Sequence, residues 1–209
     1  MNIKKILFIP FGSYEYHGPE LPSETDSIIA ERITESLAGA LRPRFEDAVK
    51  VLPPIHYGLS MEHQGFPNTM FVQHHAFYQY VFDVLDSIQE ENTLICLING
   101  HGGNKNTLLS IESDYNYTHH KSKVFVPPIF SRGIHEFCAT LFGVHDTHAG
   151  SVEASLIAHY LHQSKKEYTA NTKKVFPGSI KYFRNKEIYT DNIIQEHPQI
   201  TSDPDKGDR

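Results

Sequence analysis

The sequence predicts a layered α/β fold with a largely parallel sheet. Short apolar segments typical of buried strands alternate with helical patterns, and this alternation is typical of parallel sheets. The predicted strands cover residues 3–11, 49–52, 93–99 and 123–129. In such sheets ligands bind outside the carboxyl ends of the strands. We therefore expect functional side chains just after residues 13 and 99.

Four helices are expected from apolar residues at helical spacing. The first begins at Thr25 or Asp26 and is ended by Pro43, and its apolar stripe is Ile28, Ile29, Ile33, Leu37 and Leu41. The second spans residues 75–90, with Phe77, Val81, Leu85 and Ile88 on one face. The third spans 108–117, and the fourth spans 151–163 with Val152, Leu156 and Tyr160 as its stripe.

Length and composition indicate one domain, residues 1–209, with a less regular C-terminal part from about residue 165. A net charge of −6 without a basic tract argues against nucleic-acid binding. No apolar segment reaches the ~20 residues that a membrane span needs. The N-terminal apolar stretch is too short for a signal peptide, so we expect a cytoplasmic protein. The two cysteines form no CxxC pair, which argues against a cysteine-rich zinc site.

The first candidate site follows the first strand. Glu15 and His17 are two residues apart, a spacing that puts both side chains on the same side of an extended chain. Asp26 follows at a helix start, where a carboxylate is favourable. Carboxylates and imidazoles together are typical ligands of zinc, manganese or iron. The alternative is that Glu15 and His17 are polar loop residues and that Asp26 only caps the helix.

The second candidate is Asn99-Gly-His101-Gly-Gly-Asn104, directly after the predicted strand 93–99. Glycines allow a tight turn, which would bring His101 close to a bound ion. The alternative is a glycine-rich strand-to-helix turn or a phosphate-binding loop. The phosphate alternative has little support, because the segment lacks the P-loop lysine and the GxGxxG spacing.

The third candidate is the segment Asp146-Thr-His148-Ala-Gly-Ser-Val-Glu153, at the start of a predicted helix. His148 is suited to proton transfer at neutral pH. Glu153 is either a metal ligand or a first-turn carboxylate that stabilises the helix.

Together these motifs resemble those of the creatininase family, in the order in which the family has them. The matching segments read Gly12-Ser-x-Glu15-x-His17-Gly-Pro-x-Leu-Pro-x-x-Thr-Asp26, Tyr57-Gly-x-Ser60-x-Glu62-His63-x-x-Phe66-Pro67-x-Thr69, Asn99-Gly-His-Gly-Gly-Asn104 and His148-Ala-Gly-x-x-Glu153-x-Ser155. The resemblance implies an α/β/α sandwich, often a homo-oligomer (a hexamer or smaller), that hydrolyses amide-like C–N bonds with two divalent metals.

By position, the resemblance makes Glu15 and His101 ligands of one metal (Zn, Mn or Fe) and His17 a ligand of the other. Asp26 would bridge the two. Creatininase has a further carboxylate where this chain has Gly103, and Glu153 is our candidate replacement. The candidate catalytic residues are His148, Glu153, Glu62 and His63.

Within the resemblance, His148 would protonate the departing nitrogen or hold the tetrahedral intermediate. Glu62 and His63 lie on a loop that would line the pocket, and the alternative is that they are surface polar residues. The chain has no tryptophan, whereas creatininase closes tryptophans over its ring substrate, so creatinine itself is not expected. The family also includes an archaeal formamide deformylase and a peptidase that trims a redox-cofactor precursor.

The sequence thus predicts a metal-dependent hydrolase that cleaves a non-peptide C–N amide bond in a small molecule, either a cyclic amide or a formamide. The alternative is a catalytically degenerate family member that binds metal and acts as a binding or assembly subunit. That alternative is suggested by Gly103, whereas the presence of Asp26 and His148 argues against it.

Overall fold

The computed structural model describes residues 3–19, 21–129, 132–142 and 148–163. The contacts group the chain into two compact units, residues 1–15 with 23–129 and residues 16–22 with 130–209. Each unit is described separately below. The expected irregular region from about residue 165 lies outside the described residues, and the single domain stays a prediction.

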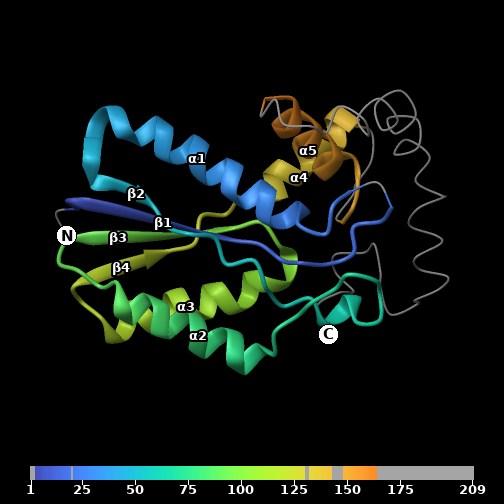
Figure 1. Ribbon diagram of the computed structural model, residues 1–209. Coiled ribbons are helices and arrows are strands. Elements are labelled where there is room, and N and C mark those ends of the chain that lie inside the picture. The colour runs from blue at the N-terminus through green and yellow to red at the C-terminus, as the bar shows by residue number, and fades with distance from the viewer. Residues whose placement is uncertain (1–2, 20, 130–131, 143–147, 164–209) are drawn as a thin grey trace. The chain divides into compact units, whose positions relative to one another are not determined.

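The first unit is built on a four-stranded parallel sheet with the strand order β2-β1-β3-β4 (Figure 1). Its strands are β1 (Lys5–Phe11), β2 (Val49–Val51), β3 (Thr93–Asn99) and β4 (Ser122–Phe125). The prediction of a parallel sheet is therefore confirmed. Proline follows both edge strands closely, at Pro53 after β2 and at Pro127 after β4, and a proline cannot donate a ladder hydrogen bond.

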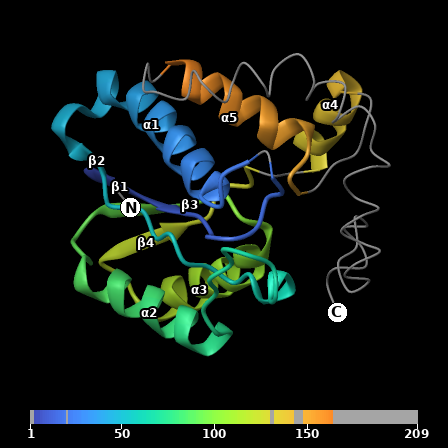
Figure 2. The ribbon, with the colours of Figure 1, turned by 45° about the vertical axis from the view of Figure 1, so that its right-hand side comes forward.

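Helices cover both faces of this sheet, as the two views in Figures 1 and 2 show. Helix α1 (Thr25–Phe45) packs against β1, β2 and β3 on one face. Helices α2 (His74–Ser87) and α3 (Lys105–Thr118) pack together, and α3 contacts β4 on the other face. The three layers confirm the predicted α/β/α arrangement.

Strand β1 is buried on both sides, and its side chains alternate between two apolar clusters. Leu7, Ile9 and Phe11 join the cluster that contains the buried faces of α2 and α3. Ile6 and Phe8 join the cluster that contains Ala38 of α1. This alternation follows from the two-residue period of a strand, and it explains why β1 reads as a continuous apolar segment.

Helix α1 differs from its prediction in two ways. Pro43 lies inside the helix, which continues to Phe45. A proline in the last turn removes only one helical hydrogen bond, and Phe45 packs against the cluster on that face. The residues facing the sheet are Ile29, Ala30, Thr34 and Ala38, so Leu37, at 37% exposure, is not part of the buried stripe.

The second unit contains α4 (Arg132–Phe142) and α5 (Ser151–Gln163), which contact each other. The sequence predicted α5 but assigned no helix to residues 132–142, where Gly133 weakens the helical signal. In α5 the buried apolar residues are Ile157 and Ala158, whereas the predicted Val152 and Leu156 are half-buried. No helix within the described part of the chain is long and apolar enough to cross a membrane.

The carboxyl ends of β1 and β3 lie side by side, because Phe11 pairs with Asn99 in the parallel register. After β1 the chain forms β2 on one side of β1 and later β3 on the other side. The strand order therefore reverses between β1 and β3, and α/β folds bind ligands at such a switch point. The first turn of α1 fits closely against both strand ends. An added Cβ at Gly12 would lie 2.2 Å from Ser27 Oγ, and one at Gly100 would lie 2.3 Å from the Asp26 carbonyl oxygen.

This close approach predicts opposite effects for two glycine substitutions. Gly100→Ala should lower the free energy of unfolding by about 1–3 kcal/mol, since the new methyl group meets the backbone of α1. Gly39→Ala, at an exposed position inside α1 with nothing within 4 Å of the new Cβ, should raise it by up to about 1 kcal/mol. Urea denaturation of both variants measures this difference, and equal stabilities would contradict the close fit.

Candidate metal site

Two carboxylates and an imidazole meet at the β1/β3 switch point of the first unit. Glu15, Asp26 and His101 are 0%, 2% and 4% exposed. His101 Nδ1 lies 3.0 Å from Asp26 Oδ2 and 3.3 Å from Glu15 Oε2. The three residues come from the segment after β1, the first turn of α1 and the segment after β3, so the fold brings distant parts of the sequence together.

The backbone around these residues is held by hydrogen bonds. The Glu15 N–H donates to the Ser23 carbonyl oxygen at 3.1 Å, which holds the segment after β1 beside the start of α1. Asn99 holds His101 from both sides, because its Oδ1 accepts from the His101 N–H at 3.2 Å and its Nδ2 donates to the His101 carbonyl oxygen at 2.7 Å. The asparagine at the end of β3 thereby fixes the direction in which His101 leaves the sheet.

The charges in this cluster raise the pKa of His101 well above its ordinary value of about 6.5. Burial alone would lower this pKa, because it disfavours the protonated ring. The Glu15 carboxylate and the hydrogen bonds to Asp26 and Glu15 more than offset that effect. The site therefore strongly favours a positive charge between the two carboxylates.

The donor set fits a divalent metal ion. Glu15, Asp26 and His101 each offer a ligand atom, and these atoms lie within 4.8 Å of one another. Carboxylate oxygen and imidazole nitrogen are ligands that zinc, manganese and iron accept. Asp26 is not the N-cap residue of α1, because the N-cap is Glu24 and Asp26 lies inside the first turn.

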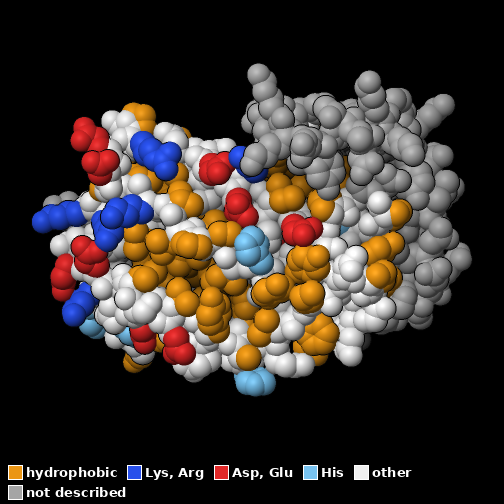
Figure 3. Space-filling view, viewed as in Figure 1, with side chains coloured by type: hydrophobic (Ala, Val, Ile, Leu, Met, Phe, Trp, Pro, Cys, Tyr) orange, Lys and Arg blue, Asp and Glu red, His pale blue; other side chains and the backbone are white. Residues whose placement is uncertain are grey.

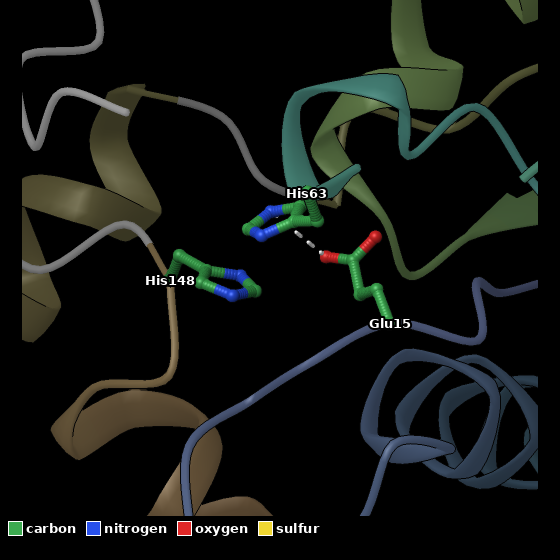
Figure 4. A group of neighbouring side chains, drawn as sticks. All are labelled: Glu15, His63 and His148. Atoms are coloured by element: carbon green, nitrogen blue, oxygen red, sulfur yellow. Dashed lines mark ion pairs between the residues drawn. The ribbon is translucent and has the colours of Figure 1, made fainter. Parts of the chain in front are cut away.

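His63 and Glu62 lie in the 3-10 helix η2 (Met61–His63), next to this cluster. His63 is buried, and its Nε2 lies 3.5 Å from Glu15 Oε1, as Figure 4 shows. It is therefore not the surface residue that the sequence allowed. Glu62 has a half-exposed side chain, and its Oε1 lies 3.8 Å from His101 Nε2.

A second donor set lies in the other unit and consists of His17, His148 and Glu153, whose ligand atoms lie within 4.8 Å of one another. His17 Nε2 is 3.9 Å from Glu153 Oε2. The rings of His17 and His148 are 4.4 Å apart, and His148 Nε2 lies 3.0 Å from the Tyr16 carbonyl oxygen. Glu153 also accepts a hydrogen bond from the Ala149 N–H at 2.6 Å, as the helix-start alternative predicted.

The predicted ligands thus fall into two sets, Glu15 with Asp26 and His101, and His17 with Glu153. His148, predicted as a proton-transfer residue, lies with the second set. Sequence reasoning did not identify the contacts that hold His101. They come from Asn99 and the Leu59 carbonyl group, and Asn104 in turn binds the Leu59 N–H. Both asparagines belong to the motif around His101, but a motif does not show which atoms a side chain contacts.

The sequence is similar to a known protein family and to proteins of known activity. The family model for creatininase, described as creatinine amidohydrolase, matches residues 2–203. A mycofactocin precursor peptide peptidase of Mycolicibacterium smegmatis is 33% identical over 159 residues, which cover 74% of this chain and 57% of that protein. A 3-dehydro-scyllo-inosose hydrolase of Thermotoga maritima is 32% identical over 99 residues, 46% of this chain and 30% of that protein. The chain therefore spans little more than half the length of the first of these relatives.

Solved structures share the fold at low sequence identity. A creatininase crystal structure is 18% identical, with a TM-score of 0.52, and the match covers 73% of this chain and 63% of that one. A structure named creatininase Mn has a TM-score of 0.54 at the same identity and coverage. Because the family model matches nearly the whole sequence, this chain belongs to the creatininase family.

Proposed function

We propose that this chain is a metal-dependent hydrolase that cleaves an amide C–N bond, and that its substrate is a small cyclic amide or a formamide. The observation that carries the proposal is that the buried carboxylates of Glu15 and Asp26 both lie next to Nδ1 of His101. A purely structural cluster has little reason to bury two carboxylates together, since each buried ion costs several kcal/mol.

The donors support two divalent ions, of which Glu15, Asp26 and His101 would hold one. His17 and Glu153 would hold the other. Two solved structures with this fold are named creatininase Mn and a Zn-Zn type of a creatininase variant, which supports Zn or Mn.

Divalent ions bound there would supply a hydroxide nucleophile at neutral pH and polarise the substrate carbonyl group. His148 would carry the proton to the departing nitrogen. Its Nε2–H donates to the Tyr16 carbonyl oxygen, so Nδ1 is the ring atom that would give and take this proton. His63, buried against Glu15, would orient that carboxylate. Glu62, at the exposed edge of the site, would contact the substrate.

A peptide bond is the second candidate substrate, favoured by the 33% identity to a peptidase of a precursor peptide. Apolar side chains are exposed over much of the face in Figure 3. On the segment that carries Glu62 and His63, Tyr57, Met61 and Met70 are 51%, 45% and 52% exposed. Such a surface is suited to apolar side chains of a peptide.

Cytoplasmic location and assembly into a homo-oligomer also stay predictions.

Two substitutions separate metal binding from proton transfer. Asp26→Ala should remove bound metal and activity together, because it deletes a ligand. His148→Ala should keep the metal and lower kcat about 10²–10⁴-fold, the range for a lost general acid. Elemental analysis of the purified variants gives the metal content, and steady-state kinetics give kcat. Loss of metal from His148→Ala would make His148 a ligand instead.

The raised pKa of His101 predicts opposite pH dependences with and without metal. Metal-free protein gains stability from protonated His101; this gain is complete below about pH 6.5 and is lost as the pH rises through the higher pKa of the folded state. Metal must displace that proton, so metal affinity should rise up to tenfold per pH unit over the same interval. Thermal unfolding and metal titrations from pH 6 upward measure both effects. A pH-independent affinity would contradict the site.

A substrate panel tests the reaction itself. Formamides, lactams, cyclic ureas and a short apolar peptide should be incubated with the zinc- or manganese-loaded protein, with Asp26→Ala as the control. We expect the wild-type protein alone to release formate and an amine from formamides, or to open the rings of lactams and cyclic ureas. Cleavage of the peptide alone would favour the second candidate. If the fully metal-loaded protein cleaves none of these compounds, the result would favour the alternative of a catalytically degenerate assembly subunit.

A further inference from the structure

His101 has two ring nitrogens, and the surroundings of Nε2 contain acceptors. Nε2 lies 2.9 Å from the Leu59 carbonyl oxygen, which can only accept a hydrogen bond. Ser60 Oγ is 3.4 Å from the same nitrogen, and Glu62 Oε1 is 3.8 Å away. Nε2 therefore carries a hydrogen atom, and Nδ1 is the nitrogen that faces Glu15 and Asp26.

Asn104, which is completely buried, anchors the backbone of Leu59. Asn104 Oδ1 accepts from the Leu59 N–H at 2.9 Å, and Asn104 Nδ2 donates to the Gly12 carbonyl oxygen at 3.0 Å. One side chain thus ties the segment after β2 to the end of β1. The N–H and the carbonyl group of Leu59 belong to neighbouring peptide units joined at its Cα, so a hydrogen bond that anchors the N–H also restricts the position of the carbonyl group.

Gly103 leaves room for this arrangement. A Cβ at position 103 would lie 2.2 Å from the Leu59 carbonyl oxygen and 2.5 Å from His101 Nε2. No side chain fits there while the carbonyl group contacts His101. The hydrogen bond from Nε2 to the Leu59 carbonyl oxygen therefore requires glycine at position 103.

We propose that Asn104 is a positioning residue, which places the Leu59 carbonyl group on Nε2 of His101 so that His101 presents Nδ1 to the metal ion. The proposal rests on the proposed function, because it assumes that His101 binds metal. Partners that bind the second nitrogen of a ligating histidine fix its tautomer and orientation, and their loss typically weakens metal affinity 10–100-fold. We expect Asn104 to act through the Leu59 carbonyl group in this way.

The test compares zinc affinity in Asn104→Ala with that in a matched control, Asn116→Ala. Asn116 also uses both amide atoms to bind backbone groups, with Nδ2 donating to the Val124 carbonyl oxygen at 2.8 Å and Oδ1 accepting from the Val124 N–H at 2.9 Å. These bonds tie α3 to β4, away from the candidate ligands. Asn104→Ala should bind zinc about 10–100-fold more weakly in a competition titration, whereas Asn116→Ala should keep the wild-type affinity.

A second measurement does not depend on any variant's folding. Nitrogen-15 NMR of histidine side chains in zinc-loaded wild-type protein should show His101 bound through Nδ1, with a proton on Nε2. Binding through Nε2, or an unchanged zinc affinity in folded Asn104→Ala, would overturn this inference and leave the proposed function intact. Failure of the wild-type protein to bind zinc, manganese or iron would overturn both.

Discussion

Two buried carboxylates that face one imidazole are the interaction on which the rest of this structure depends. Glu15 and Asp26 are both removed from water, and each would cost several kcal/mol if left as an isolated ion. A positive charge between them is therefore required. In the metal-free state protonated His101 provides it, which is why its pKa is raised. A divalent ion would provide more charge at the same place and free His101 to act as a ligand.

The fold serves this cluster by bringing three chain segments to one point. Parallel pairing of β1 with β3 puts Phe11 beside Asn99, so the residues that follow both strands leave the sheet together. Gly12 and Gly100 have no side chain to keep the first turn of α1 away. Asp26 thereby reaches the strand ends, although it is far from His101 in the sequence.

The outline of the fold and most candidate ligands were predictable from the sequence. Strand 93–99 was predicted with its observed bounds, because a fully buried strand with a polar end leaves a clear pattern. Gly12-Ser13 after β1 and Gly100 after β3 marked the strand ends near which the candidate ligands lie. The grouping of Glu15 with Asp26 and His101, rather than with His17, required coordinates.

Other features depend on tertiary packing, which a local pattern does not contain. Leu37 fits a helical stripe but is exposed, because the small residues Ala30, Thr34 and Ala38 bring α1 close to the sheet. The helix continues past Pro43 because Phe45 is packed against the core. The role of Gly103 also needs the structure, since only coordinates show the Leu59 carbonyl group where a side chain would be.

The most direct test of this account is a crystal structure of zinc-soaked protein with data collected at the zinc absorption edge. The account predicts an anomalous peak about 2.0–2.2 Å from a carboxylate oxygen of Glu15, a carboxylate oxygen of Asp26 and Nδ1 of His101. The absence of a peak at these three residues, with His101 still paired directly with both carboxylates, would contradict it.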